Sequence, residues 1–196
     1  MPPTPSLTIF PSATAGVLLG PECLAAAVYK VVNSRSYPGW GNMIDRGATT
    51  IWETWKESDD IYSNCHSIFG SVSEWMYRWL AGIRPDPDHP GFEKFTIAPS
   101  LPAGLDHVTC SYHSPFGEIR SNWRREGINK QSFDITVLEG SLALVRLPVR
   151  EDQKIILAEG KSADAYGPQR DGPTHMQFEL GPGSYTISIE DTGTRP

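Results

Sequence analysis

Two repeat patterns of apolar residues divide the chain. In residues 68–80 apolar side chains recur three or four positions apart, so that Val72, Trp75, Met76 and Trp79 share one side of a predicted helix. Residues 21–32 also have helical composition, with a proline at the first position, where a helix tolerates it. Residues 33–46 contain a Pro-Gly pair and a further glycine, and we expect a loop there.

Beyond residue 91 apolar residues recur at every second position, which is typical of strands with one buried face. Turn residues such as Gly181-Pro182-Gly183 separate the alternating or apolar runs. We expect about eight strands, at Phe95 and Ile97, Val108, Ile119 with Ser121, residues 133–137, 142–147, 155–157, 176–180 and 185–189. Short strands separated by regular turns favour an antiparallel sandwich.

A proline-rich segment, residues 84–91, lies between the two patterns. Three prolines in eight residues cannot continue a helix, and we interpret the segment as a hinge. The sequence therefore predicts an α+β protein with a short helical part over residues 1–88 and an antiparallel β-sandwich over residues 89–196.

Composition excludes several classes of partner. The formal net charge of −6 over 196 residues argues against non-specific binding to nucleic acid or to an anionic membrane surface. Arg124 and Arg125 form a lone basic pair, which we expect to be solvated. No apolar stretch is long enough for a transmembrane helix, and no basic, unbroken signal peptide is evident, so we expect a cytoplasmic location.

The cysteines and histidines give no metal or disulfide pattern. Cys23, Cys65 and Cys110 are odd in number and widely spaced, which favours free thiols. The five histidines lack ligand spacing, and phosphate-loop and dinucleotide motifs are missing from the sequence. We therefore expect neither a metal nor a cofactor.

The most informative segment is residues 47–55, which place Glu53 between Trp52 and Trp55. A carboxylate between indoles suits a sugar site, because sugar C–H faces stack on indole rings while hydroxyls seek charged acceptors. The same residues also fit a helix start near Thr50, with a threonine as N-cap and both indoles in the core. Residue types alone leave both interpretations open.

Four segments resemble, in order, the end of the catalytic domain and the following domain of α-L-rhamnosidases. The resemblance runs from about residue 15 to residue 190, nearly the whole chain. The segments are residues 37–55 (YPGWGNMIDRGATTIWETW), 63–87 (SNCHSIFGSVSEWMYRWLAGIRPDP), 90–99 (PGFEKFTIAP) and 111–123 (SYHSPFGEIRSNW).

The resemblance implies a fold and a set of site residues. It implies the closing part of an (α/α)6 barrel followed by a C-terminal β-sandwich, and an inverting reaction that uses two carboxyl groups. Glu53 corresponds to the general base, and His66 to a histidine that contacts the sugar hydroxyls. The general acid of the family lies far upstream, on a segment with no counterpart in this chain. The connection between Glu53 and His66 is also shorter than expected in the family.

We therefore expect Glu53 and His66 to act in catalysis, and Tyr37, Trp40, Trp52 and Trp55 to contact the substrate. Three functions remain open: a truncated rhamnosidase-like hydrolase, an enzyme reused for acid–base chemistry on a hydrophobic small molecule, and a non-catalytic sugar-binding module. The partner is then a sugar or another small molecule. Two or three helices cannot close a twelve-helix barrel, so we expect a homodimer through apolar faces at residues 15–35 and 66–82.

Overall fold

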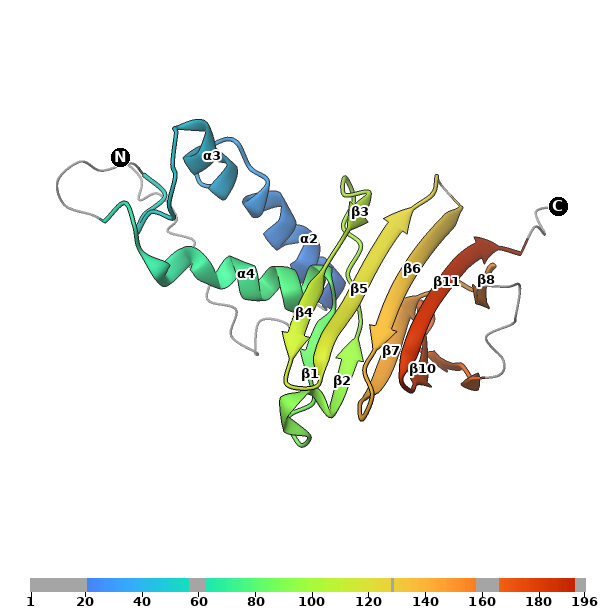
Figure 1. Ribbon diagram of the computed structural model, residues 1–196. Coiled ribbons are helices and arrows are strands. Elements are labelled where there is room, and N and C mark those ends of the chain that lie inside the picture. Colours follow the sequence, from blue (N-terminus) through green and yellow to red (C-terminus); the bar gives the residue numbers. More distant parts are fainter. Residues whose placement is uncertain (1–20, 57–62, 128, 158–165, 193–196) are drawn as a thin grey trace.

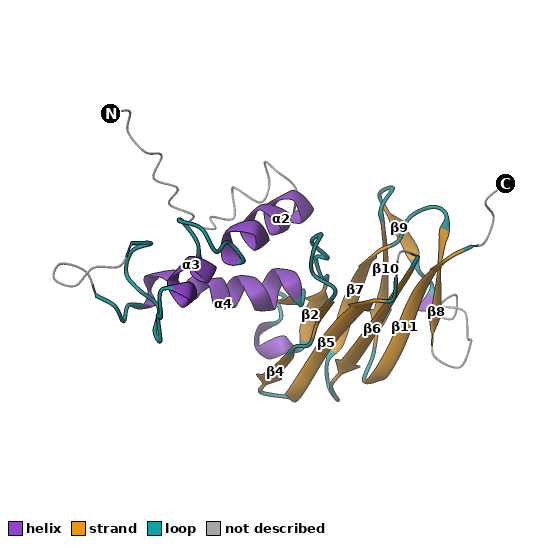
Figure 2. Ribbon diagram, turned by 90° about the horizontal axis from the view of Figure 1, so that it is seen from above, coloured by secondary structure: helices purple, strands orange, loops and turns teal. Residues whose placement is uncertain are grey.

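The protein consists of a helical part packed beside the edge of a two-sheet sandwich (Figure 1). The computed structural model describes residues 21–56, 63–127, 129–157 and 166–192. Turned by a right angle, Figure 2 shows the helices gathered at one end of the molecule and the strands at the other. The predicted α+β class is confirmed.

The first sheet has five strands in the order β1, β2, β7, β10, β9. Its neighbours are antiparallel except β2 and β7, which run parallel because the chain crosses to the other sheet between them. The strands span Ile83–Pro85 (β1), Lys94–Ile97 (β2), Leu142–Pro148 (β7), Gln169–Asp171 (β9) and His175–Leu180 (β10).

The second sheet has six strands in the order β3, β5, β6, β11, β8, with β4 also paired to β5. All of its pairings are antiparallel. The strands span His107–Val108 (β3), Ser111–Ser114 (β4), Gly117–Arg125 (β5), Lys130–Val137 (β6), Gln153–Leu157 (β8) and Gly183–Asp191 (β11).

The core lies between the two sheets and follows the alternation seen in the sequence. In β6, Phe133, Ile135 and Val137 point inward, and in β11 Ile187 and Ile189 do the same. All five are at most 3% exposed. Burying such side chains contributes about 1.5–3 kcal/mol each, so this core is the main source of stability for the sandwich.

The sequence pattern missed three strands, β1, β4 and β9. β1 begins at Ile83 and includes Arg84 and Pro85, which we expected in a hinge. β9 is polar and only three residues long, so it carries no alternation. β4 forms a hairpin with β5, and it is only four residues long.

The helical part contains α2 (Pro21–Val32), α3 (Trp40–Asp45) and a continuous helical run near the sandwich. That run changes pitch along its length, from the 3₁₀ turn η1 (Ser67–Ser71) through α4 (Val72–Trp75) to the π turn η2 (Met76–Leu80). A small cluster of Ala25, Val28, Val72, Trp75 and Leu80 packs α2 against it. A further 3₁₀ turn, η3 (Pro90–Phe92), precedes β2.

Two expectations about the helical part are wrong, because residues 40–45 form a helix inside the predicted loop and Met76 is not buried. Residues 51–56 form no helix, so the helix start near Thr50, one of the two interpretations left open, is not observed. Met76 is 41% exposed instead of buried with Val72 and Trp75. The wider π turn that begins at Met76 alters the spacing on which that prediction depended.

Side chains of β5 bind the end of the helical run. The Trp123 indole N–H donates to the Leu80 carbonyl at 2.8 Å, and the Ser121 hydroxyl donates to the Ala81 carbonyl at 2.6 Å. Gly82 follows with a φ of 80°, and a Cβ there would lie 2.3 Å from the Ala98 carbonyl carbon. The junction therefore requires glycine.

Arg125 is a structural residue that we expected to be solvated. Its guanidinium donates to the carbonyls of Leu101, Pro102 and Leu105 at 2.5–3.0 Å. Since the Tyr29 hydroxyl on α2 donates to the carbonyl of Gly104, at 3.1 Å, Arg125 holds the loop against which the helical part rests.

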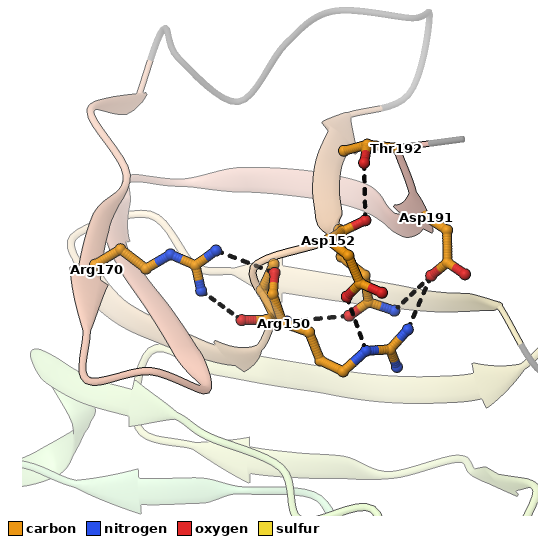
Figure 3. A network of polar contacts seen from close by, with 7 residues as sticks. Arg150, Asp152, Arg170, Asp191 and Thr192 are labelled. Atoms are coloured by element: carbon orange, nitrogen blue, oxygen red, sulfur yellow. Dashed lines mark hydrogen bonds and ion pairs between the residues drawn. The ribbon is translucent and has the colours of Figure 1, made fainter. Parts of the chain in front are cut away.

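A polar network ties the two sheets together near the end of β11 (Figure 3). The Arg150 guanidinium donates to Asp152 and to Asp191, each at 3.0 Å. Arg170 donates to the carbonyls of Val149 and Arg150, and the Thr192 hydroxyl donates to the carbonyl of Asp152. These contacts join β8, β9 and the end of β11.

Candidate active site around Glu53

Glu53 lies in an irregular segment that is held by hydrogen bonds to Ser63, on the other side of the following loop. Its backbone N–H donates to the Ser63 carbonyl at 2.8 Å, and the Ser63 N–H donates to Glu53 Oε2, also at 2.8 Å. This reciprocal pair supplies the partners that a helix would have supplied within the segment. It also gives the half-buried carboxylate a defined orientation.

His66 lies on the strand-like stretch that runs beside Glu53. The His66 N–H donates to the Ile51 carbonyl at 2.8 Å, and the Thr50 hydroxyl donates to the Asn64 carbonyl. Residues 50–53 and 63–66 therefore run side by side, and the short connection between Glu53 and His66 still brings their segments together. The His66 side chain is half-buried.

Two of the predicted sugar-contacting indoles form one aromatic cluster with Phe69. Trp40 meets Trp55 edge to face at a centroid distance of 4.5 Å, and Trp55 stacks on Phe69 at 4.4 Å. Trp40 and Phe69 are 5.9 Å apart. The cluster joins three segments, α3, the Glu53 segment and η1, and each ring is partly exposed.

The other two predicted contact residues lie in opposite environments. Trp52 is 5% exposed, so nearly all of its ring surface already contacts protein. Tyr37 is 62% exposed and extends into solvent just before a cis proline. The structure thus brings Trp40 and Trp55 together, while Trp52 packs inside and Tyr37 stands apart.

Sequence reasoning missed Ser63 and Phe69. Ser63 acts through its backbone, so its side-chain type carried no signal. Phe69 lies three residues after His66, one turn along η1, and this helical spacing could have placed it near the site. Its contact with Trp55 spans fourteen positions and could not be found from local periodicity.

The nearby carboxylates do not offer a clear general acid. Asp45 forms an ion pair with Arg35, and Glu74 pairs with Arg78 at 2.9 Å. Glu57, Asp59 and Asp60 lie outside the described residues. Among these carboxylates, Glu53 is the one on the same segment as Trp55, and the Ser63 N–H holds its Oε2.

The described residues contain no group of three or more His, Cys, Asp or Glu side chains placed to hold a metal. Cys65 and Cys110 are free thiols, as expected, while the side chain of Cys23 lies outside the description. Of the helices in the described ranges, none combines the length and apolar character that a bilayer crossing demands.

Two family models match consecutive stretches of the chain. Residues 21–80 match the bacterial alpha-L-rhamnosidase six-hairpin glycosidase domain, and residues 82–162 match the bacterial alpha-L-rhamnosidase C-terminal domain. The change from one model to the other falls at the Ala81–Gly82 junction, where the helical run meets β5.

Individual relatives agree with these models. An alpha-L-rhamnosidase of Streptomyces avermitilis is 28% identical over 171 residues, which are 82% of this chain and 16% of the relative. The alpha-L-rhamnosidase structure from Dictyoglumus thermophilum superposes with a TM-score of 0.75 and 31% identity, over 85% of this chain and 19% of that one.

A second structure, a Streptomyces avermitilis alpha-L-rhamnosidase complexed with L-rhamnose, gives a TM-score of 0.71 at 25% identity, over 84% of this chain and 16% of the other. The chain thus spans less than a fifth of the length of each of these relatives. By both of its parts, the helical and the β-sandwich, this chain belongs to the α-L-rhamnosidase family.

Proposed function

We propose that this chain carries the general-base side of an α-L-rhamnosidase-type glycoside hydrolase site, with Glu53 as the base. The observation that supports the proposal most directly is the 2.8 Å hydrogen bond from the Ser63 N–H to Glu53 Oε2. A base must present a fixed oxygen to the proton that it removes, and this bond fixes the carboxylate from the backbone.

In the proposed reaction, Glu53 takes a proton from a water that attacks the anomeric carbon. An inverting enzyme also needs an acid to protonate the leaving oxygen, with the two carboxyl groups roughly 6.5–9.5 Å apart. The family's acid has no counterpart in this chain. We therefore expect the chain alone to hold a sugar and a water but to cleave glycosidic bonds poorly.

The proposed substrate is an L-rhamnoside. The exposed parts of Trp40 and Trp55 provide apolar ring surface for the C–H face of a sugar. His66 and Tyr37 are the proposed hydrogen-bond partners of the hydroxyls. One relative in the same family has been crystallised with L-rhamnose, which supports this choice.

The alternative function is acid–base chemistry on a hydrophobic small molecule, such as cyclisation, isomerisation or elimination. It is favoured by the three-ring cluster of Trp40, Trp55 and Phe69, whose members lie on or near the segments that carry Glu53 and His66, because acid–base chemistry on an apolar substrate needs no second carboxyl group. A sugar-binding module without catalysis would use the same rings and leave Glu53 as a hydrogen-bond acceptor.

The test is hydrolysis of a nitrophenyl α-L-rhamnoside, whose leaving group needs little protonation. We expect weak turnover, since losing general-acid assistance costs about 10²–10⁴-fold, and we expect Glu53→Gln to abolish it. The amide keeps the shape of the side chain, so the variant should lose at most about 1 kcal/mol of unfolding free energy. Glu74→Gln, which alters an exposed carboxylate on α4, is the matched control.

Three outcomes separate the candidates. Full activity in Glu53→Gln would remove this residue from the site, and strong wild-type turnover that depends on Glu53 would mean that another group supplies the proton. Absence of turnover, combined with a thermal shift by apolar polycyclic compounds and none by rhamnosides, would favour the alternative function. Rhamnose binding that survives in Glu53→Gln without any turnover would favour the sugar-binding module.

A further inference from the structure

A polar hollow lies on the outer face of the second sheet, where β3, β5, β6 and β11 are neighbours (Figure 1). Its volume is about 410 Å³. Sites for small ligands commonly have volumes of roughly 300–1,000 Å³, so the hollow is large enough for one. Neither Glu53 nor the aromatic cluster of Trp40, Trp55 and Phe69 borders it, so it is separate from the candidate active site.

The residue types in the middle of this face are unusual for strands. Asn122 of β5 lies directly opposite Asp134 of β6, and Asp134 lies opposite Thr186 of β11. The outer face of an antiparallel sheet is commonly polar, but asparagine and aspartate are depleted from strands. An asparagine paired with an aspartate across two inner strands is therefore a local cost, and residues that break a local preference are found most often at functional sites.

Side-chain length explains why this face is hollowed. In the next row along the strands, Ser132 of β6 lies between Arg124 of β5 and Ser188 of β11. His107 of β3 lies on the other side of Arg124, and both of these longer side chains are exposed. Residues two positions apart on a strand are separated by about 7 Å. The short side chains therefore leave a depression, which the long ones border on the β3 side.

Hydrogen bonds already orient the two central side chains. The Cys110 N–H donates to Asn122 Oδ1 at 3.0 Å, which leaves the Asn122 amide nitrogen as a donor toward the hollow. The Thr186 hydroxyl donates to Asp134 Oδ1 at 2.8 Å, which leaves Oδ2 as an acceptor. An oriented donor next to an oriented acceptor can bind two neighbouring hydroxyl groups of one ligand.

The charges of the lining favour an uncharged ligand. Lys130 forms an ion pair with the Glu126 carboxylate at the rim, at 3.2 Å. The remaining charges on the described lining are one cation, Arg124, and one anion, Asp134, so neither a polyanion nor a polycation meets an excess of opposite charge. The Trp123 ring is 2% exposed and lies in the core, so it offers no surface on which an aromatic ligand could stack.

We infer that this hollow is a second, non-catalytic site that binds an uncharged saccharide. Asp134 accepts a hydrogen bond from one hydroxyl group, the Asn122 amide donates to a neighbouring hydroxyl group, and Arg124 donates to a third. The inference does not rest on the activity proposed for Glu53, because the class of ligand follows from the lining of the hollow. Water competes for the same hydrogen bonds, so we expect a dissociation constant in the millimolar range.

The experiment is an NMR titration of the isotope-labelled full chain with three uncharged disaccharides, rutinose, maltose and cellobiose. We expect at least one of them to shift the side-chain amide signals of Asn122, together with the backbone amides of residues 122–124 and 132–134. The side-chain amide of Asn122 is the direct reporter, because its nitrogen is the proposed donor to the sugar.

Two variants locate the binding. Asp134→Asn removes the charged acceptor, while its amide oxygen can still accept from Thr186, so the disaccharide should bind about tenfold more weakly. Glu118→Gln makes the same chemical change on the same face of β5 but outside the hollow, and it should leave the affinity unchanged. Glu53→Gln should also leave the Asn122 shifts unchanged, which separates this site from the proposed active site.

Three results would overturn the inference. The first is an Asn122 side-chain amide that does not respond to any of the three disaccharides. The second is an affinity that is the same in Asp134→Asn as in the wild type. The third is a stronger response to digalacturonate or to diglycine than to the disaccharides, which would assign the hollow to an anionic or a zwitterionic ligand.

Discussion

The sandwich and the helical part differ in how much apolar core each has to offset its unsatisfied polar groups. In the sandwich, ten of the nineteen buried residues of the core cluster are 0% exposed, and continuous strand ladders pair the backbone. In the helical part, which is the smaller of the two, the Trp40 and Trp75 indole N–H groups and the Asn42 amide nitrogen are buried without a hydrogen-bond partner.

This difference indicates that the helical part depends on its contact with the sandwich. A buried polar group without a partner costs about 1–3 kcal/mol, so the three in the helical part cancel a large share of what its five buried side chains contribute. In the sandwich, the unsatisfied oxygens of Gln131 and Ser141 are set against nineteen buried residues. The helical part is therefore stabilised largely by its junction with the sandwich. We expect the sandwich to tolerate loss of the helical contacts better than the helices tolerate loss of the sandwich.

Substituting the junction glycine should have the largest effect. In Gly82→Ala the new Cβ would lie 2.3 Å from backbone atoms of Ala98 and Pro99, at a φ of 80°. Left-handed strain and overpacking together should lower the unfolding free energy by roughly 3 kcal/mol or more, measured by urea denaturation. In the control Gly104→Ala, φ is 84° but the Cβ meets nothing within 4 Å, so about 1 kcal/mol should be lost. Equal losses would show that strain, not contact, limits this junction.

A matched pair of valines should sharpen the comparison between the two cores. Val145→Ala in β7 should lower the global unfolding free energy by about 2 kcal/mol, because the side chain is completely buried between the sheets. Val72→Ala in α4 should instead speed amide hydrogen exchange in residues 72–81 and leave exchange in β6 and β11 unchanged. Equal effects on both sets of amides would mean that the two parts unfold as one unit.

The smallest effect concerns acid stability at the sandwich edge. The Arg146 guanidinium beside Asp171 lowers the pKa of that carboxyl below its usual value. The pair therefore stabilises the fold above the unfolded-state pKa of about 3.9, and this contribution is lost as the pH falls through the lower folded-state pKa. In Asp171→Asn, the unfolding free energy measured by urea denaturation should therefore fall slightly less between pH 5 and pH 3 than in the wild type.

The control for this change is Glu139→Gln, at an exposed position in the turn before β7. This variant should lose as much unfolding free energy between pH 5 and pH 3 as the wild type does. Because the Arg146–Asp171 pair is partly exposed, 0.5 M salt should reduce the difference between wild type and Asp171→Asn. A decline that is identical in the two proteins at low salt would show that the pair adds nothing to acid stability.

Much of the sandwich could be predicted from the sequence, because alternation records which face of a strand is buried. Ile119, Phe133, Ile135, Ile187 and Ile189 are all predicted strand residues and all lie in the core. β1, β4 and β9 carry too few apolar positions for that signal, and their existence depends on pairing with neighbours.

The candidate site was predictable only in its residue types. The sequence drew attention to Glu53, Trp40 and Trp55, and these do lie on segments that meet. A helix start near Thr50 was one of its two interpretations of the Glu53 segment, whereas the partner of the Glu53 backbone N–H is Ser63, ten residues away across a loop. The packing of Trp40, Trp55 and Phe69 likewise depends on tertiary contacts that local periodicity cannot encode.

The hydrogen bonds from Trp123 and Ser121 to the carbonyls of Leu80 and Ala81 can form only late in the synthesis of the chain. The partners are separated by 43 and 40 residues, and the carbonyl of each pair leaves the ribosome first. The carbonyls in the last turn of the helical run therefore have no side-chain donor until β5 has left the ribosome. The end of the helical run thus completes its hydrogen bonds only after β5 is made, although the run itself is made first.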